Sequence, residues 1–130
     1  MLCACADISV ILKARQPPHD FQTLRSVDDA IVQLTRAGVK TALAMGDEDN
    51  ARNLRWEAGL AQDQGLTFEE ALASVTTQPA SMFGLPDYVG RIVVGQKANF
   101  VVFNGAPLSL QGQQVLVALG SYVECQPQQR

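Results

Sequence analysis

Apolar residues recur along the first part of the chain at spacings that predict alternating strands and helices. The run Ile8 to Leu12 predicts a short buried strand, and the prolines within 16–20 predict a loop, because proline fixes φ and removes a backbone donor. Helical spacing then predicts a helix over about 27–37, with Gly38 as its left-handed end. That helix is marked by Val27, Ala30, Ile31 and Leu34, after a Ser26–Asp29 pair that resembles a capping box.

A second strand is predicted directly after this helix. The apolar run Val39 to Met45 has the length of a buried strand, and the polar cluster Gly46 to Asn50 follows it. In parallel α/β architectures, the loop after the carboxyl end of a strand is where chemistry is usually placed. The cluster is therefore the first candidate site in the sequence.

Three further helices are predicted before residue 85. Helical spacing over 53–64 predicts the first, which Gly65 ends. Thr67 and Glu70 form a capping box for the second. The third is short, with Pro79 in its first turn, an end at Phe83 and Gly84 as its cap.

The rest of the chain is rich in β-forming residues separated by glycine-bearing turns. We therefore expect an α/β fold followed by a small β unit, with boundaries at 1–84 and 85–125 and a flexible tail at 126–130. The predicted strands of the β unit are Arg91–Val94, Asn99–Phe103, Val115–Leu119 and Tyr122–Glu124.

Composition and charge narrow the classes of function. Apolar residues make up 47% and charged residues 18% of the 130 positions, which is typical of a folded domain rather than a disordered one. The net charge of −3, with scattered lysine and arginine, gives no basic patch, so we expect neither a nucleic-acid nor a membrane partner. Asp7 before the first apolar run and Lys13 after it do not fit a signal peptide.

The three cysteines, Cys3, Cys5 and Cys125, are an odd number, which argues against a secreted disulfide framework and predicts a cytoplasmic location. Cys3 and Cys5 could form half of a metal site, but a second ligand pair at suitable spacing is missing, so burial in a strand is the favoured interpretation. His19 is the single histidine. One copy of the chain therefore cannot assemble a multi-histidine metal site.

A series of short motifs resembles the carboxy-terminal part of metal-dependent amidohydrolases related to imidazolonepropionase and dihydroorotase. The stretches Gly65–Leu72, Val75–Ala80 and Phe83–Leu85 resemble the pattern G-L-x-x-x-x-A-L…T-x-x-P-A…G of the last barrel helices in these enzymes. Gly90–Phe103 resembles the family pattern G-x-I-x-x-G-x-x-A-D-x-V-V. The ordered series covers roughly residues 25–125.

The resemblance implies an architecture and a chemistry. Val39–Met45 would be the last strand of a (β/α)₈ barrel, and residues from about 90 would complete a small β-sandwich. The activity implied is hydrolysis of carbon–nitrogen bonds other than peptide bonds. The implied cofactor is a divalent metal, with zinc expected, held mainly by histidines and a carboxylated lysine from earlier strands and acidifying a bound water.

Asp47 corresponds in this resemblance to the aspartate at the end of the last barrel strand, which handles the water proton and contacts the metal. The family places that aspartate directly after serine or threonine, whereas Met45-Gly46 precedes it here, so a solvated loop carboxylate is the alternative. Arg52 and Asn53 could donate hydrogen bonds to a substrate carboxylate or carbonyl, with surface or capping roles as the alternative. For Glu48 and Asp49 we favour exposed or capping roles over cation binding.

Three hypotheses follow. The chain is a fragment of an amidohydrolase, inactive by itself, which needs a missing amino-terminal barrel portion and takes a small-molecule amide substrate. It is otherwise a stand-alone, non-catalytic module that self-associates through open strand edges. The third hypothesis is an unrelated small α/β domain whose sequence matches the amidohydrolase pattern by chance. In each case we expect no tightly bound metal on the isolated chain.

Overall fold

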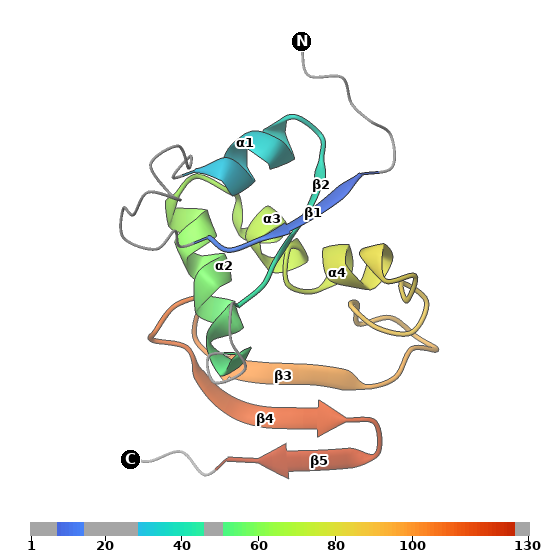
Figure 1. Cartoon of the computed structure of the whole chain (residues 1–130). Helices are drawn as coiled ribbons and strands as arrows, with labels where there is room; N and C mark the ends of the chain where they lie inside the picture. The colour runs from blue at the N-terminus through green and yellow to red at the C-terminus, as the bar shows by residue number, and fades with distance from the viewer. Residues whose placement is uncertain (1–7, 15–28, 46–50, 127–130) are drawn as a thin grey trace.

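The computed structural model describes residues 8–14, 29–45 and 51–126, which form a helical part built around a small parallel sheet and a separate antiparallel sheet (Figure 1). The fold is thus mixed α/β followed by a small β unit, in agreement with the prediction from the sequence. In chain order the elements are β1 (Ser9–Leu12), α1 (Ala30–Arg36), β2 (Lys40–Leu43), the 3₁₀ turn η1 (Ala51–Asn53), α2 (Leu54–Asp63), α3 (Phe68–Ala73), α4 (Thr77–Met82), β3 (Asn99–Asn104), β4 (Gln113–Leu119) and β5 (Tyr122–Cys125).

The parallel sheet consists of β1 and β2. The two strands pair from Ser9 opposite Lys40 to Leu12 opposite Leu43, and the Ala44 amide donates to the Leu12 carbonyl oxygen over 2.9 Å. On the far side of β2, the Leu43 amide donates to the Ser74 carbonyl oxygen at 3.0 Å. Strand β2 is therefore engaged on both sides, whereas β1 lies at the edge of the sheet.

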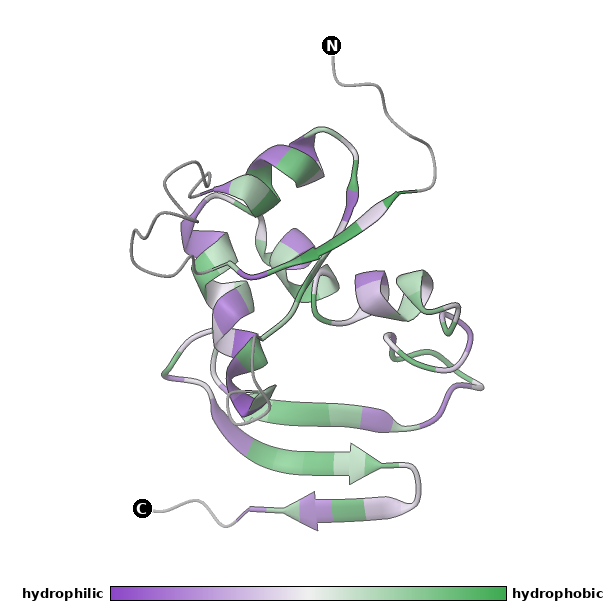
Figure 2. Ribbon diagram, in the orientation of Figure 1, coloured by the Kyte–Doolittle hydropathy of each residue, from purple (hydrophilic) through white to green (hydrophobic). Residues whose placement is uncertain are grey.

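The core lies where α1, α2 and α3 meet β2 (Figure 2). Ile31 and Val32 of α1 are 1% exposed, and Ala58 and Ala61 of α2 are fully buried. Small alanines on α2 let the neighbouring elements approach closely, so the interior is filled by the branched side chains of α1 and β2. The buried cluster comprises Ala14, Ile31, Val32, Leu43, Ala58, Ala61, Leu66, Ala71 and Leu108.

The capping box at the start of α3 forms as predicted. The Glu70 amide donates to Thr67 Oγ1 at 3.2 Å, and the Thr67 amide donates to Glu70 Oε2 at 2.8 Å. Two amides that a helix start would leave without a backbone partner are thereby satisfied. The predicted helix ends are confirmed as well, since Gly38, Gly65 and Gly84 all have positive φ.

One predicted helix start is wrong. Helix α1 begins at Ala30, with Asp29 in the N-cap position and no side-chain capping bond; Ser26 lies outside the described residues. Asp29 Oδ1 accepts a hydrogen bond from Gln33 Nε2 at 2.9 Å. Because Asp29 is itself the N-cap residue, it is not the third helical residue that the predicted capping box requires. For α4 the prediction is confirmed, because the helix begins at Thr77 and Pro79 therefore lies in its first turn, where no backbone donor is needed.

The antiparallel sheet has the order β3-β4-β5, with an irregularity in register between Val102 and Phe103. It is a thin layer, and every residue of β5 is exposed. Gly120, at φ 65°, makes the tight turn between β4 and β5, where Leu119 pairs with Tyr122. Three of the four strands predicted for the β unit are confirmed in this sheet.

The fourth predicted strand, Arg91–Val94, does not form. Ile92 is 82% exposed and Val94 is fully exposed, although both residue types favour strands. Strand conformation is stabilised by ladder hydrogen bonds and cross-strand contacts, and no strand among the described residues pairs with this segment. Arg91 is accordingly a surface residue whose guanidinium donates to the Pro86 carbonyl oxygen at 3.3 Å, rather than the first residue of a strand.

The connection between β3 and β4 joins the antiparallel sheet to α2. Its Leu108 side chain is 6% exposed and belongs to the buried cluster, although it lies far along the chain from the helices. The Leu108 carbonyl passes so close to Gly59 that a Cβ atom on the glycine would overlap it. This contact requires glycine at position 59 of the helix.

Candidate functional site

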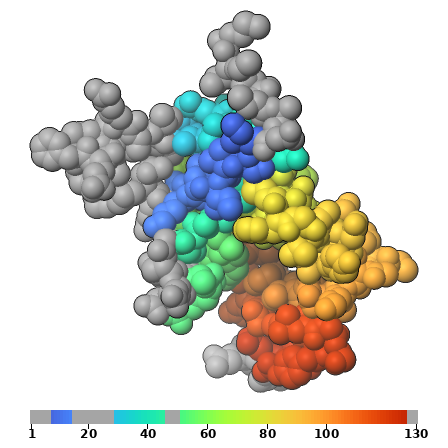
Figure 3. Space-filling model, turned by 45° about the vertical axis from the view of Figure 1, so that its right-hand side comes forward, coloured from blue at the N-terminus to red at the C-terminus, as the bar shows by residue number. Residues whose placement is uncertain are grey.

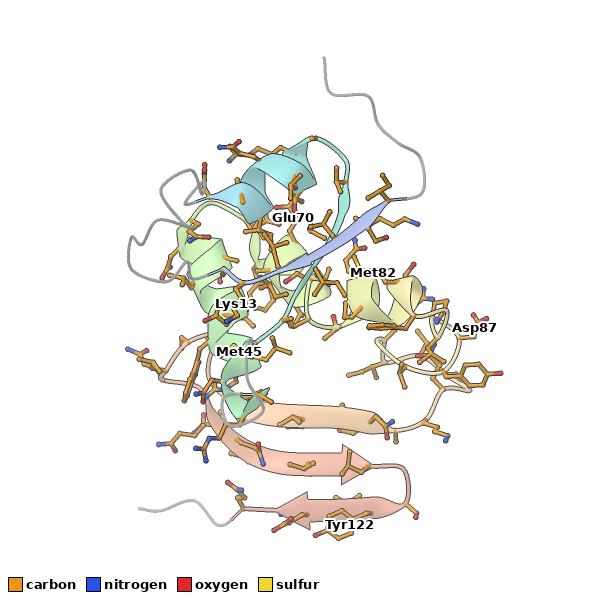
Figure 4. All side chains as sticks on the ribbon, viewed as in Figure 1. Lys13, Met45, Glu70, Met82, Asp87 and Tyr122 are labelled. Atoms are coloured by element: carbon orange, nitrogen blue, oxygen red, sulfur yellow. The ribbon has the colours of Figure 1, made fainter. Side chains whose placement is uncertain are left out.

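The carboxyl end of β2 is the place where the sequence predicts chemistry. Ala44 and Met45 follow the strand, both half-buried, and Figure 4 shows Met45 beside α2. The predicted catalytic acid and metal ligand, Asp47, lies outside the described residues, together with Glu48 and Asp49. Its assignment stays a prediction from the sequence.

The predicted substrate-binding residues lie in the turn that leads into α2. Arg52 is the second residue of η1 and is exposed to solvent. Asn53 is half-buried and occupies the N-cap position of α2, with φ −93° and ψ 1°. Its side chain makes no capping hydrogen bond to the helix, so the predicted capping alternative is wrong for this residue, and it has another interaction partner. The two residues are placed together, and a substrate contact remains a prediction for both.

Metal ligands are a second requirement of the predicted chemistry. Within residues 8–14, 29–45 and 51–126, no group of three or more His, Cys, Asp or Glu side chains is arranged to hold a metal ion. Cys125 has an exposed free thiol at the end of β5, and His19, Cys3 and Cys5 lie outside these ranges. The residues within these ranges therefore do not form a ligand set that fits a hydrolytic metal.

Arg55 has two backbone acceptors and two aromatic rings around its guanidinium, and sequence reasoning missed it. Its Nη1 donates to the carbonyl oxygens of Pro107 at 2.8 Å and Ser109 at 2.9 Å. The guanidinium carbon also lies 4.9 Å from the ring centre of Trp56 and 5.1 Å from that of Phe103. These contacts fix the β3–β4 connection on α2, so Arg55 serves the fold beside the candidate site rather than a ligand.

A tyrosine–carboxylate pair lies on β5, in the antiparallel sheet and away from the end of β2 (Figure 4). The Tyr122 hydroxyl donates to Glu124 Oε2 at 3.0 Å. This hydrogen bond, together with the negative charge of Glu124, raises the pKa of Tyr122 above its ordinary value of 10.0. Both residues of the pair are exposed to solvent.

The chain belongs to the amidohydrolase family, because the profile described as Amidohydrolase family matches residues 44–126. The match begins at the carboxyl end of β2 and runs through β5. It therefore includes the candidate loop, η1, the three following helices and the antiparallel sheet.

Known proteins of this family resemble the chain over part of their length. Amidohydrolase tasK of Hapsidospora irregularis is 38% identical over 68 residues, which is 52% of this chain and 7% of that protein. The crystal structure of an amidohydrolase from Thermotoga maritima MSB8 superposes with a TM-score of 0.67 at 27% identity, over 73% of this chain and 25% of that one. A second crystallised amidohydrolase gives a TM-score of 0.65 at 26% identity, over 87% of this chain and 30% of the other.

The chain thus spans 7% of the curated relative and between a quarter and a third of the matched structures. Among the described residues, no helix has both the length and the apolar character needed to cross a membrane.

Proposed function

We propose that this chain is the carboxy-terminal segment of an amidohydrolase that hydrolyses carbon–nitrogen bonds other than peptide bonds, and that it is inactive by itself. The observation that carries the proposal is the family match over residues 44–126, combined with coverage of only 25% to 30% of the matched amidohydrolase structures. The sequence adds a chemical reason, because its single histidine cannot supply the several imidazoles of a hydrolytic metal site.

In this proposal β1 and β2 are the last two strands of a (β/α)₈ barrel, with α1 as the crossover between them. The parallel pairing of β1 with β2 and the placement of α1 between them in sequence support this assignment. The antiparallel sheet β3-β4-β5 would then belong to a β-sandwich completed by another part of the polypeptide. The unformed strand at 91–94 supports that view, since its exposed Ile92 and Val94 lack a strand to pair with among the described residues.

Each candidate residue has a role in the completed enzyme. Asp47, which follows the end of β2 at Leu43 in the sequence, would orient the attacking water, accept its proton and contact a divalent metal, with zinc expected. Arg52 and Asn53, two consecutive residues at the start of α2, would donate hydrogen bonds to a small-molecule amide substrate. The partner required is the amino-terminal barrel portion that carries the remaining metal ligands.

Zinc content and turnover test the first part of the proposal. We expect the purified chain to bind no stoichiometric zinc and to leave simple cyclic amides and acyl dipeptides intact. Metal-dependent turnover by the isolated chain, abolished by a chelator, would overturn it. The coding sequence upstream of Met1 supplies an independent check, because an open frame encoding a His-x-His strand is expected for an enzyme segment.

The role of Asp47 is tested in the polypeptide extended by that upstream frame. Asp47→Asn is expected to lower kcat by about 10²- to 10⁴-fold, because it removes the group that accepts the water proton. Glu48→Gln is the matched control in the same loop and is expected to retain activity. Equal losses in the two variants would contradict the assignment of Asp47.

The second candidate is a stand-alone, non-catalytic module built on the same fold. The single histidine and the exposed edge of β1 favour it. A stop codon and a ribosome-binding site directly upstream of Met1 would distinguish this module from an enzyme segment.

A further inference from the structure

Helices α2 and α3 begin in different ways. Thr67 and Glu70 close a capping box at the start of α3, whereas Asn53, at the N-cap position of α2, makes no side-chain capping hydrogen bond. A helix start without such a cap leaves backbone amides without a partner in the helix, and helix ends of this kind fray. Arg52 and Asn53, the candidate substrate-binding residues, come directly before this turn. Their placement therefore depends on what else holds the first turn of α2.

That turn is held by the connection between β3 and β4. Arg55, the second residue of α2, donates from Nη1 to the carbonyl oxygens of Pro107 at 2.8 Å and Ser109 at 2.9 Å. Its guanidinium carbon also lies 5.1 Å from the ring centre of Phe103 in β3. Leu108, between the two acceptors, belongs to the buried cluster, so the connection is itself fixed in place. The surface of α2 (green) adjoins that of the antiparallel sheet (orange to red) in Figure 3.

We infer that Arg55 is a positioning residue for the candidate site. By fixing the first turn of α2 on the β3–β4 connection, it fixes Arg52 and Asn53 as well, because the 3₁₀ turn η1 runs into α2 with no residue between them. The antiparallel sheet thus acts on the site without placing one of its own side chains there. The link to substrate rests on the proposed function, whereas the hold on the turn rests on the contacts of Arg55 alone.

Hydrogen exchange on the unaltered chain tests the hold on the turn. The carbonyl of an N-cap residue accepts the first hydrogen bond of its helix, so the amides of Glu57 in α2 and Ala71 in α3 report the two first turns. Protection of the two amides should agree within about tenfold, although only α3 has a capping box. A freely exchanging Glu57 amide beside a protected Ala71 amide would overturn the proposal without any variant.

Arg55→Lys gives the matching test by substitution. Lysine keeps the charge but not the planar guanidinium, so the Glu57 amide should exchange about tenfold faster relative to the amide of Ala61, later in the same helix. Val32→Ala is the control, because it removes buried methyl groups from α1 and should not speed Glu57 relative to Ala61. An Arg55→Lys protein in which Glu57 and Ala61 change by the same factor would contradict a local hold on the turn.

The single tryptophan of the chain supplies a spectroscopic signature of the same contact. The Arg55 guanidinium carbon lies 4.9 Å from the ring centre of Trp56, which is 37% exposed. Opening of the turn admits water to that ring face, so the Trp56 emission maximum should move to longer wavelength in Arg55→Lys. The emission of Val32→Ala should match the wild type. An emission maximum that Arg55→Lys leaves in place would count against the proposal.

Kinetics of the polypeptide extended by the upstream frame test the link to substrate. Arg55→Lys should raise KM about tenfold and leave kcat within about threefold, because Arg52 and Asn53 bind substrate whereas Asp47 acts on the water. Val32→Ala should change neither constant. An unchanged KM in Arg55→Lys would overturn the positioning role. An extended polypeptide with no turnover at all would instead overturn the proposed function, and the exchange result would still decide whether Arg55 holds the turn.

Discussion

The Leu108 carbonyl lies directly against the backbone of Gly59, in the space that a Cβ atom would take on any other residue. Gly59 is in the middle of α2, where glycine ordinarily weakens a helix, and Leu108 is in the connection between β3 and β4. Two nearby contacts reinforce this approach, because Arg55 donates to the carbonyl oxygens on either side of Leu108. Helix α2 is therefore the element that holds the antiparallel sheet to the helical part.

Gly59→Ala should destabilise the protein, although alanine is the better helix former. The added methyl group collides with the Leu108 carbonyl, and relieving the collision displaces the β3–β4 connection at a cost of about 1–3 kcal/mol. Urea denaturation followed by circular dichroism measures the change. Gln62→Ala, at an exposed position on the same helix, is the control and should stay within about 0.5 kcal/mol of wild type. If Gly59→Ala is more stable than the wild type, the Leu108 carbonyl can move away from position 59 at little cost.

Arg55→Lys should lower stability even though the charge is kept. A lysine ammonium cannot reproduce the planar guanidinium that reaches two carbonyl oxygens and lies over two aromatic rings. The expected loss is about 1–3 kcal/mol in the free energy of unfolding. Arg52→Lys, three residues earlier at an exposed position, should have little effect. If Arg55→Lys and Arg52→Lys lower the free energy of unfolding equally, Arg55 does not anchor the β3–β4 connection on α2.

The capping box of α3 predicts a difference between two neighbouring glutamates. Glu69 and Glu70 both lie in the first turn of α3, so replacing either by alanine loses the same favourable interaction with the helix dipole. Only Glu70 also accepts a hydrogen bond from the Thr67 amide. Glu70→Ala should therefore lower the free energy of unfolding by about 0.5 kcal/mol more than Glu69→Ala does. Thr67→Ala should cost about 1 kcal/mol. Thermal unfolding of the three variants and of the Thr67→Ala/Glu70→Ala pair shows whether the two residues act together.

The raised pKa of Tyr122 predicts a change at alkaline pH. The stabilising contact with Glu124 is fully present below the ordinary tyrosine pKa of 10.0 and is lost as pH rises through the higher pKa of the folded state. The phenolate absorbance of a Tyr88→Phe variant reports Tyr122 by itself, since the chain has two tyrosines. Adding Glu124→Gln should lower the titration midpoint, whereas adding Glu69→Gln should leave it unchanged. An unchanged midpoint in the Glu124→Gln protein would mean that the pair does not persist in solution.

The position of the candidate site after β2 was accessible from the sequence, because the end of a strand is a local feature; the roles of its residues stay predictions. The run Val39–Met45 and the polar residues after it located the end of β2, and Arg52 and Asn53 do lie together at the start of α2. Arg55 was not accessible, because the carbonyl groups that it contacts lie more than 50 residues away, at Pro107 and Ser109. The neighbouring Trp56 in the sequence suggests that Arg55 contacts an aromatic ring, but it does not indicate which distant carbonyl groups the guanidinium binds.

The sequence by itself determined where the helices end and how α3 begins. Gly38, Gly65 and Gly84 end helices because positive φ is a property of a single residue, and Thr67 with Glu70 caps α3 within four positions. The tertiary structure decided what needs a distant partner. Arg91–Val94 has strand-forming residues and forms no strand, and Gly59 is required in a helix that would favour alanine. Pairing and close packing depend on which backbone lies next to a segment in space, and local preference does not specify that neighbour.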